Sequence, residues 1–161
     1  MLPPAYRLHV GAWATLQTWA APVRLAVFVQ EQGIPVAEEW DADDAHALHA
    51  VITDAQGVPV ATGRLLQPQP GLAQIGRMAV LSSHRGKHIG ASILQALCDA
   101  AAARGDTQWV LHAQRSAEGF YRRHGFEPEG EPYDEVGIEH ITMRKKLRTL
   151  RDRERSPANR S

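Results

Sequence analysis

The spacing of apolar residues divides this chain into a helical segment followed by alternating strands and helices. Residues 12–33 carry apolar side chains at roughly helical spacing and predict one or two helices, interrupted near Pro22. Two β-rich runs around the turn residues DAQG predict a hairpin over 49–66, and AQIGRMAVL (73–81) predicts a third strand. The polar, proline-containing and acidic stretch 33–46 between them is expected to be a loop.

The second half of the chain continues this pattern. Apolar residues share one side of a predicted helix over 91–103, which Arg104–Gly105 ends. Residues 108–114 alternate as in a strand, Ser116 is expected to cap a short helix over 117–124, and 137–147 alternate again as a final strand. Helices followed by the order β-β-β-α-β-α-β predict an α/β (mixed α+β) fold with one central mixed sheet and helices on both faces.

Length and composition predict a single globular domain. The chain has 161 residues, of which 43% are hydrophobic and 22% charged, close to globular averages. The single cysteine, Cys98, excludes an intramolecular disulfide framework and a cysteine-rich metal site. No window approaches the ~18 apolar residues of a membrane span, and the N-terminus lacks a signal-peptide core, so we expect a cytoplasmic protein with no membrane contact.

The formal net charge of zero conceals an asymmetry. Residues 148–161 hold five arginines and two acids, a net of +3, and are expected to be a basic, disordered tail after a domain spanning 1–147. The domain itself has 13 basic and 16 acidic side chains, a net of −3. Because nucleic-acid-binding domains carry a basic face, this balance argues against a nucleic-acid partner.

The stretch HRGKHIGASIL (84–94) combines glycines and cations between a predicted strand and a predicted helix. Glycine lets a ligand approach the backbone closely, and a helix N-terminus favours an anion, most naturally a phosphate. A Walker nucleotide site does not fit, because Lys87 precedes a histidine and the first glycine of that motif is missing. A Rossmann site fails on glycine spacing and on the preceding hairpin.

Two motifs resemble the GNAT superfamily of N-acetyltransferases. GRMAVLSSHRGKHIGASILQAL (76–97) is similar to its acyl-CoA-binding segment, Arg/Gln-x-x-Gly-x-Gly/Ala between a strand and a helix, with His88 where the first glycine is usual. VLHAQRSAEGFYRRHGF (110–126) resembles the second motif, which ends in Phe-Tyr-x-x-x-Gly-Phe. VFVQEQG, DDAHALH and YDEVGIEHITMRKKL extend the similarity to the ElaA-like subgroup over most of 20–147.

The resemblance implies a GNAT-like fold and the residues that hold acetyl-CoA as co-substrate. They are the strand residues Met78, Ala79 and Val80, the turn residues Arg85, Gly86, Lys87, His88, Ile89, Gly90 and Ala91, and Gln114 and Ser116 as pantetheine or adenylate contacts.

Acetyl transfer to an amine needs a neutral amine, a polarised carbonyl and a protonated leaving thiolate, and it needs no metal. The resemblance implies that Tyr121 protonates the thiolate. For deprotonation the sequence leaves several candidates open, namely Glu31, Glu39, Asp43, Asp44, His46, His49, His140 and water, of which we take Glu39 and His140 as catalytic candidates. The spacing of His46 and His49 also suggests a metal, but only weakly, and we expect none.

The acceptor is expected to be an amine of a small molecule or peptide. Its predicted contacts are Phe28, Glu31, Glu38, Asp43 and Asp44. Residues 31–44 hold six acids and no base, which predicts a preference for acceptors with a second positive charge. A CoA-binding sensor with the same fold, and an interaction protein tethered through its basic tail, are the alternatives. The sequence leaves monomer and homodimer open.

Overall fold

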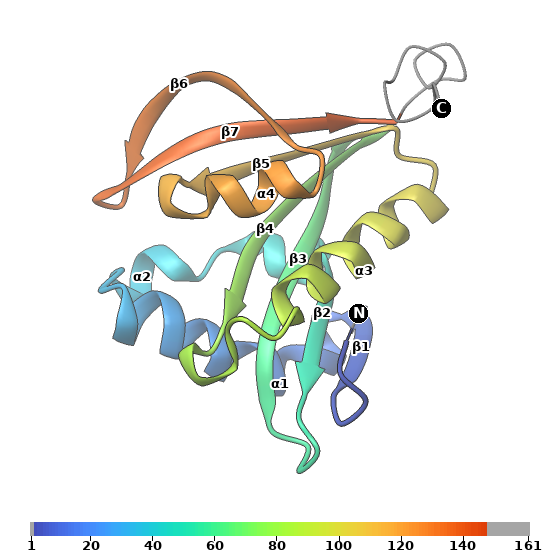
Figure 1. Ribbon diagram of the computed structural model, residues 1–161, viewed down its shortest axis with the longest axis vertical. Helices are drawn as coiled ribbons and strands as arrows, with labels where there is room; N and C mark the ends of the chain where they lie inside the picture. The colour runs from blue at the N-terminus through green and yellow to red at the C-terminus, as the bar shows by residue number, and fades with distance from the viewer. Residues whose placement is uncertain (1, 148–161) are drawn as a thin grey trace.

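The computed structural model describes residues 2–147, which form one seven-stranded mixed sheet (Figure 1). The strand order is β1-β2-β3-β4-β5-β7-β6, and β4–β5 is the parallel pair among antiparallel neighbours. The strands are β1 (Arg7–Ala12), β2 (Leu48–Thr53), β3 (Pro59–Gln69), β4 (Leu72–Val80), β5 (Gln108–Gln114), β6 (Glu127–Glu135) and β7 (Ile138–Lys146). The fold class and the mixed sheet predicted from the sequence are confirmed.

Helices cover both faces of this sheet. On one face lie α1 (Trp13–Arg24), its π-helical continuation Leu25–Glu31, and the short α2 (Val36–Glu39) with the 3₁₀ helix Ala42–His46. The other face carries α3 (Ile89–Ala103) and α4 (Glu118–Arg123), and short 3₁₀ turns span Ser82–His84 and Arg115–Ala117. Adjacent residues of β2 show the two layers: Ile52 packs in the cluster with α3, whereas Val51 packs with Leu16 and Ala20 of α1.

The sheet opens between its two parallel strands. β4 and β5 pair only from Leu72 to Ile75 and from Gln108 to Leu111, although β4 continues to Val80 and β5 to Gln114. Each strand keeps its outer neighbour over the rest of its length, β3 for β4 and β7 for β5. The two halves of the sheet therefore diverge beyond Ile75, as the separation of β4 and β5 in Figure 1 shows.

Two edge strands were not predicted. β1 exposes Leu8 and Val10, and its short run gives only a weak alternation. β6 contains Pro128, Pro132 and several acids, a composition that is tolerated because an edge strand pairs on one side only. Both strands form through tertiary pairing with β2 and β7 rather than through their own propensity.

Three local predictions were wrong. Pro22 does not interrupt the first helix, because burial of Val23 and Arg24 on the same face carries α1 past it. Residues 33–46 are not a plain loop but contain α2 and a 3₁₀ turn. Ser116 does not cap α4: it lies in the preceding 3₁₀ turn, and Ala117 occupies the N-cap position.

The predicted basic tail, 148–161, lies outside the described residues. Within residues 2–147, no helix has the length and apolar character needed to cross a bilayer.

Candidate active site

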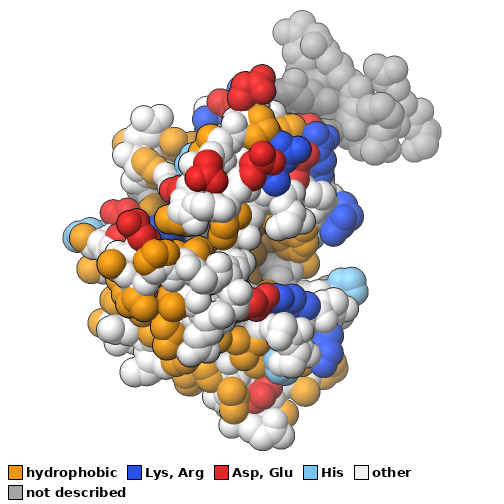
Figure 2. Space-filling view, turned by 90° about the vertical axis from the view of Figure 1, so that its left-hand side faces the viewer, with side chains coloured by type: hydrophobic (Ala, Val, Ile, Leu, Met, Phe, Trp, Pro, Cys, Tyr) orange, Lys and Arg blue, Asp and Glu red, His pale blue; other side chains and the backbone are white. Residues whose placement is uncertain are grey.

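A cavity of about 1050 Å³ occupies the opening between β4 and β5. It is lined on one side by β4, the turn before α3 and the π-helix, and on the other by β5, α4 and the β6–β7 hairpin. Figure 2 shows a hollow in the molecular surface in this region. All three predicted catalytic residues, Tyr121, Glu39 and His140, border this one cavity.

The turn between β4 and α3 presents free backbone amides. Gly86 and His88 have φ angles of +80° and +63°, so the chain turns twice through the left-handed region before α3 begins. Histidine is among the non-glycine residues that adopt this conformation, which explains how it replaces the usual glycine. The amides of Ile89, Gly90 and Ala91 have no backbone acceptor among the described residues, so these helix N-terminal donors are available to an anion.

Strand β4 contains a β-bulge where it borders the cavity. Thr62 pairs with Ala79 and Arg64 with Gly76, so β4 has one extra residue here, and Arg77 adopts a φ of +51°. Beyond Ile75 the inner edge of β4 has no strand partner. Its peptide groups therefore face the cavity, where they can bind an extended chain such as a pantetheine arm.

Arg85 is held by both strand and helix neighbours. Its Nε donates to the carbonyl oxygen of Val80 at 3.0 Å, and its two Nη atoms donate to the Glu31 carboxylate, each at 2.7 Å. Hydrogen bonds to Arg85, followed by its charge, lower the pKa of Glu31. Glu31 was predicted to contact the acceptor, and the structure pairs it instead with an arginine of the turn predicted to bind the coenzyme.

Tyr121 projects from α4 into the cavity on the α3 side. The residue is 8% exposed and packs edge-on against Phe120 and Phe126. Burial raises the pKa of its phenol to about 12. The hydroxyl therefore keeps its proton through neutral pH, as a general acid requires.

His140 borders the cavity from β7, on the sheet face opposite α3. Its Nδ1 lies 2.7 Å from the carbonyl oxygen of Ile138, which can only accept, so Nδ1 carries the proton. In the neutral ring, Nε2 is then the free basic nitrogen. The imidazole stacks on Tyr133 at a centroid distance of 6.0 Å, and this contact fixes its orientation.

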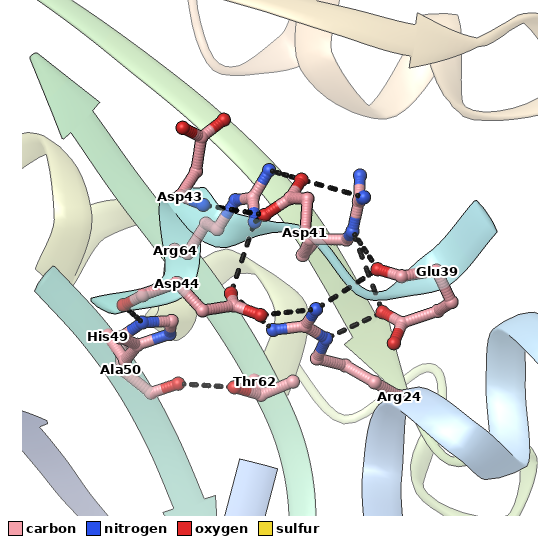
Figure 3. Close-up of polar contacts among 10 residues, drawn as sticks. Arg24, Glu39, Asp41, Asp43, Asp44, His49, Ala50, Thr62 and Arg64 are labelled. Atoms are coloured by element: carbon pink, nitrogen blue, oxygen red, sulfur yellow. Dashed lines mark hydrogen bonds and ion pairs between the residues drawn. The ribbon is translucent and has the colours of Figure 1, made fainter. Parts of the chain in front are cut away.

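Three acids of segment 39–44, Glu39, Asp41 and Asp44, form an ionic cluster with arginines from other elements, and Glu39 and Asp44 are buried in it (Figure 3). Arg24 donates to Glu39 at 2.6 Å and to both oxygens of Asp44 at 2.8 and 3.1 Å. Arg64 donates to Asp41 at 2.7 and 2.9 Å and to Asp44 at 3.1 Å. The cluster is therefore balanced internally, and the predicted excess of negative charge here is largely neutralised.

Two aromatic rings and a third arginine complete this cluster. The Arg24 guanidinium lies 5.2 Å from the Trp13 ring centroid and 4.9 Å from that of Trp40. Arg77, on the β4 bulge, donates to the Glu39 carbonyl oxygen and to Asp41, both at 3.2 Å. These contacts shape the floor below the cavity and connect α1, α2 and β4.

The remaining predicted residues fall into two groups. Those that border the cavity are Phe28, Glu31, Glu38, Met78, Ala79, Val80, Arg85, Gly86, His88, Ile89, Gly90, Ala91, Gln114 and Ser116. Lys87, Asp43 and Asp44 do not border it, and Asp44 is buried in the ionic cluster instead.

Sequence reasoning missed a number of further cavity residues, among them Gln32, Arg77 and His112. Gln32 and Gln114 exchange amide hydrogen bonds of 2.8 and 3.3 Å across the opening between the strands. His112 follows Leu111, the last residue of β5 that pairs with β4, and its Nδ1 contacts the Thr142 hydroxyl at 3.1 Å. Because His112 lies on the polar side of an alternating strand, the sequence pattern could have identified it as a candidate cavity residue.

The described residues contain no cluster of three or more His, Cys, Asp or Glu side chains arranged to hold a metal ion. His49, one of the histidines weighed for this role, is buried, with its Nε2 3.0 Å from the Asp44 carbonyl oxygen and its ring against Trp13. Burial is the main cause that lowers its pKa.

Comparison with known proteins identifies the class. Residues 22–147 match the acetyltransferase (GNAT) domain family, and the chain belongs to this family. It is 38% identical over 124 residues to the uncharacterized N-acetyltransferase YjcF of Bacillus subtilis, covering 76% of this chain and 87% of that one. Protein ElaA of Escherichia coli is 31% identical over 145 residues, covering 87% and 94%.

A solved structure agrees with both the fold and the family. The crystal structure of an acyl-CoA N-acyltransferase from Pseudomonas aeruginosa superposes with a TM-score of 0.78 at 31% identity, covering 87% of this chain and 99% of that one. The protein is therefore a GNAT-type N-acetyltransferase that uses an acyl-CoA co-substrate and an amine acceptor, and the predicted resemblance is confirmed.

Proposed function

We propose that this enzyme transfers the acetyl group of acetyl-CoA directly to a primary amine of a small molecule or peptide. The observation that carries the proposal is the cavity between β4 and β5. It is bordered by the free amides of the α3 N-terminus, by Tyr121 on one sheet face and by His140 on the other. Such a passage accommodates two substrates at once, so no acetyl-enzyme is needed.

The residues of the turn fit the coenzyme's phosphates. Three unpartnered amides and the positive end of a 15-residue helix favour a pyrophosphate between Gly86 and Ala91. When bound, the coenzyme supplies an activated acetyl thioester. The unpaired inner edge of β4 offers peptide groups along which the pantetheine arm extends.

His140 and Tyr121 carry out the two proton transfers, His140 as general base and Tyr121 as general acid. The amine nitrogen forms a bond to the thioester carbonyl carbon, and the carbon–sulfur bond breaks. His140 Nε2 accepts the proton lost by the amine, and Tyr121 gives its proton to the departing sulfur. Solvent then takes the proton from the His140 imidazolium and returns one to the Tyr121 phenolate.

Glu39 is a poor choice for this base. Its side chain is 1% exposed, and Oε1 accepts a 2.6 Å hydrogen bond from Arg24. The carboxylate is thus engaged by Arg24 and has little exposed surface from which to reach an amine in the cavity. We assign Glu39 to the support of the cavity floor.

Acetylation of an amine panel tests the proposal. We expect wild-type protein with acetyl-CoA to release free CoA thiol only when a primary amine is present, with one acetyl group added to the amine by mass spectrometry. Intact-mass analysis without an amine should show unmodified protein. Thiol release with no acetylated amine from any panel member, or a stable acetyl-protein, would contradict direct transfer.

A further inference from the structure

The cavity has an apolar rim on the β6–β7 hairpin, which also carries His140, the proposed base for the acceptor amine. Val136 at the hairpin tip borders the cavity and is 39% exposed. Phe28 and Ile34, from the π-helix and the turn after it, line the same cavity. Ile138, the first residue of β7, packs with their cluster and keeps the hairpin close to it.

Val136 occupies an unfavourable backbone conformation. Glu135 pairs with Ile138, so Val136 and Gly137 form a two-residue turn, with φ angles of +48° and +77°. Both central residues of such a turn need positive φ, which suits asparagine, aspartate or glycine. A β-branched residue there is a rare, strained outlier. An exposed valine at this position gives up stability while placing two methyl groups at the cavity edge.

The charges on this side do not suit a polycation. Of the six acids in 31–44, Glu31, Glu39, Asp41 and Asp44 each bind an arginine, and Asp43 does not border the cavity. Within residues 2–147, Glu38 is the member of this set that borders the cavity without an ion pair. Glu135, the residue before Val136, also borders the cavity without an ion pair in this range. The cavity lining as a whole holds five acids and four arginines, a net charge of −1, which suits one ammonium group better than several.

We propose that the acceptor is a monoamine with an apolar body, and that Val136 is a specificity-determining residue that contacts this body. This inference rests on the proposed function. A single cationic amine approaches past Glu38, and its aromatic or branched alkyl portion packs between Val136 and the wall formed by Phe28 and Ile34. The strained valine is then retained for substrate selection.

The test compares three probe amines: ethylamine, 2-phenylethylamine and spermidine. For wild-type enzyme we expect kcat/KM to be at least tenfold higher with 2-phenylethylamine than with either of the others. Val136→Asn keeps a residue that tolerates the turn and removes the apolar contact. It should lower kcat/KM for 2-phenylethylamine five- to twentyfold, leave that for ethylamine within twofold, and raise Tm.

Val58→Asn is the matched control, because Val58 is 49% exposed at the other hairpin, β2–β3, and does not border the cavity. It should leave all three values within twofold. A wild-type preference for spermidine, equal use of the three amines, or an unchanged amine profile in Val136→Asn would overturn the inference while leaving acetyl transfer intact. Absence of acetylation with every amine would instead count against the proposed function.

Discussion

Glu31 and Arg85 form a bidentate ion pair, in which both nitrogen–oxygen distances are 2.7 Å. The pair joins the end of the π-helix to the turn that precedes α3. The next residue along the chain, Gln32, pairs with Gln114 of β5. Two consecutive side chains thus contact residues on opposite sides of the cavity, Glu31 the turn after β4 and Gln32 the strand β5. The arginine expected to meet a pyrophosphate already holds a carboxylate in the free protein.

This pairing predicts that Glu31 competes with the coenzyme. Glu31→Gln removes a carboxylate that occupies Arg85 and repels a pyrophosphate, so the Kd for CoA should fall about two- to fivefold, within the limit of about 1 kcal/mol that an exposed pair contributes. Calorimetric titration measures this change. Pantetheine, which has no pyrophosphate, should bind both proteins equally.

Glu38→Gln provides the control, because Glu38 borders the same cavity without an arginine partner among residues 2–147. It should leave CoA affinity within twofold. Weaker CoA binding by Glu31→Gln would mean that Glu31 orients Arg85 for the coenzyme rather than competing with it.

Tyr121→Phe should remove the proton donor with little change in packing. We expect kcat to fall ~10²-fold while the Kd for CoA and Tm stay close to wild type. Because burial raises the phenol pKa to about 12, the wild-type kcat should not decline between pH 8 and 10 through loss of this proton. A kcat loss below about threefold would assign the proton to water.

Arg24 should be a stability residue. Arg24→Met leaves the carboxylates of Glu39 and Asp44 buried without their main partner, which costs about 3–5 kcal/mol for a broken buried pair. Chemical denaturation measures this loss. Glu39→Gln should also lower stability, yet keep kcat of the folded enzyme within threefold; a hundredfold loss would restore Glu39 as the base.

The same cluster should make the stability of the folded protein depend on pH in the acidic range. Hydrogen bonds from Arg64, followed by its charge, are the main causes that lower the pKa of Asp41 in the folded state. A lowered folded-state pKa stabilises the protein above the unfolded value, about 3.9, and this contribution is lost as pH falls through the folded value. Wild-type Tm should therefore exceed that of Asp41→Asn at pH 6, and the difference should shrink below pH 4. A constant difference would exclude this linkage.

Strong local patterns made much of the fold predictable. The alternation of 108–114 predicted the strand β5 with its correct bounds, and the helix after the turn begins within two residues of its expected start. Edge strands β1 and β6 were missed because pairing with a neighbour, rather than their own composition, makes them strands.

The acidic segment shows what a single sequence does not reveal. Its carboxylates looked like a free negative surface because their partners, Arg24 and Arg64, lie 15 and 20 residues or more away along the chain. Only the folded arrangement brings these charges together. The residues at the α3 turn were predictable because their chemistry lies within one contiguous motif.

Calorimetric titration of CoA into wild-type protein and Gly90→Val tests the central claim, a coenzyme site at the α3 N-terminus, most directly. A Cβ at Gly90 would meet Val80 at 3.5 Å and Phe120 at 3.7 Å, ordinary contacts, so Gly90→Ala should fold normally, and valine should add bulk toward the cavity. We predict one CoA site in the wild type and at least tenfold weaker binding by Gly90→Val, with unliganded Tm values of all three proteins close together. Equal CoA affinity of wild type and Gly90→Val, or no binding by the wild type at millimolar CoA, would contradict the account.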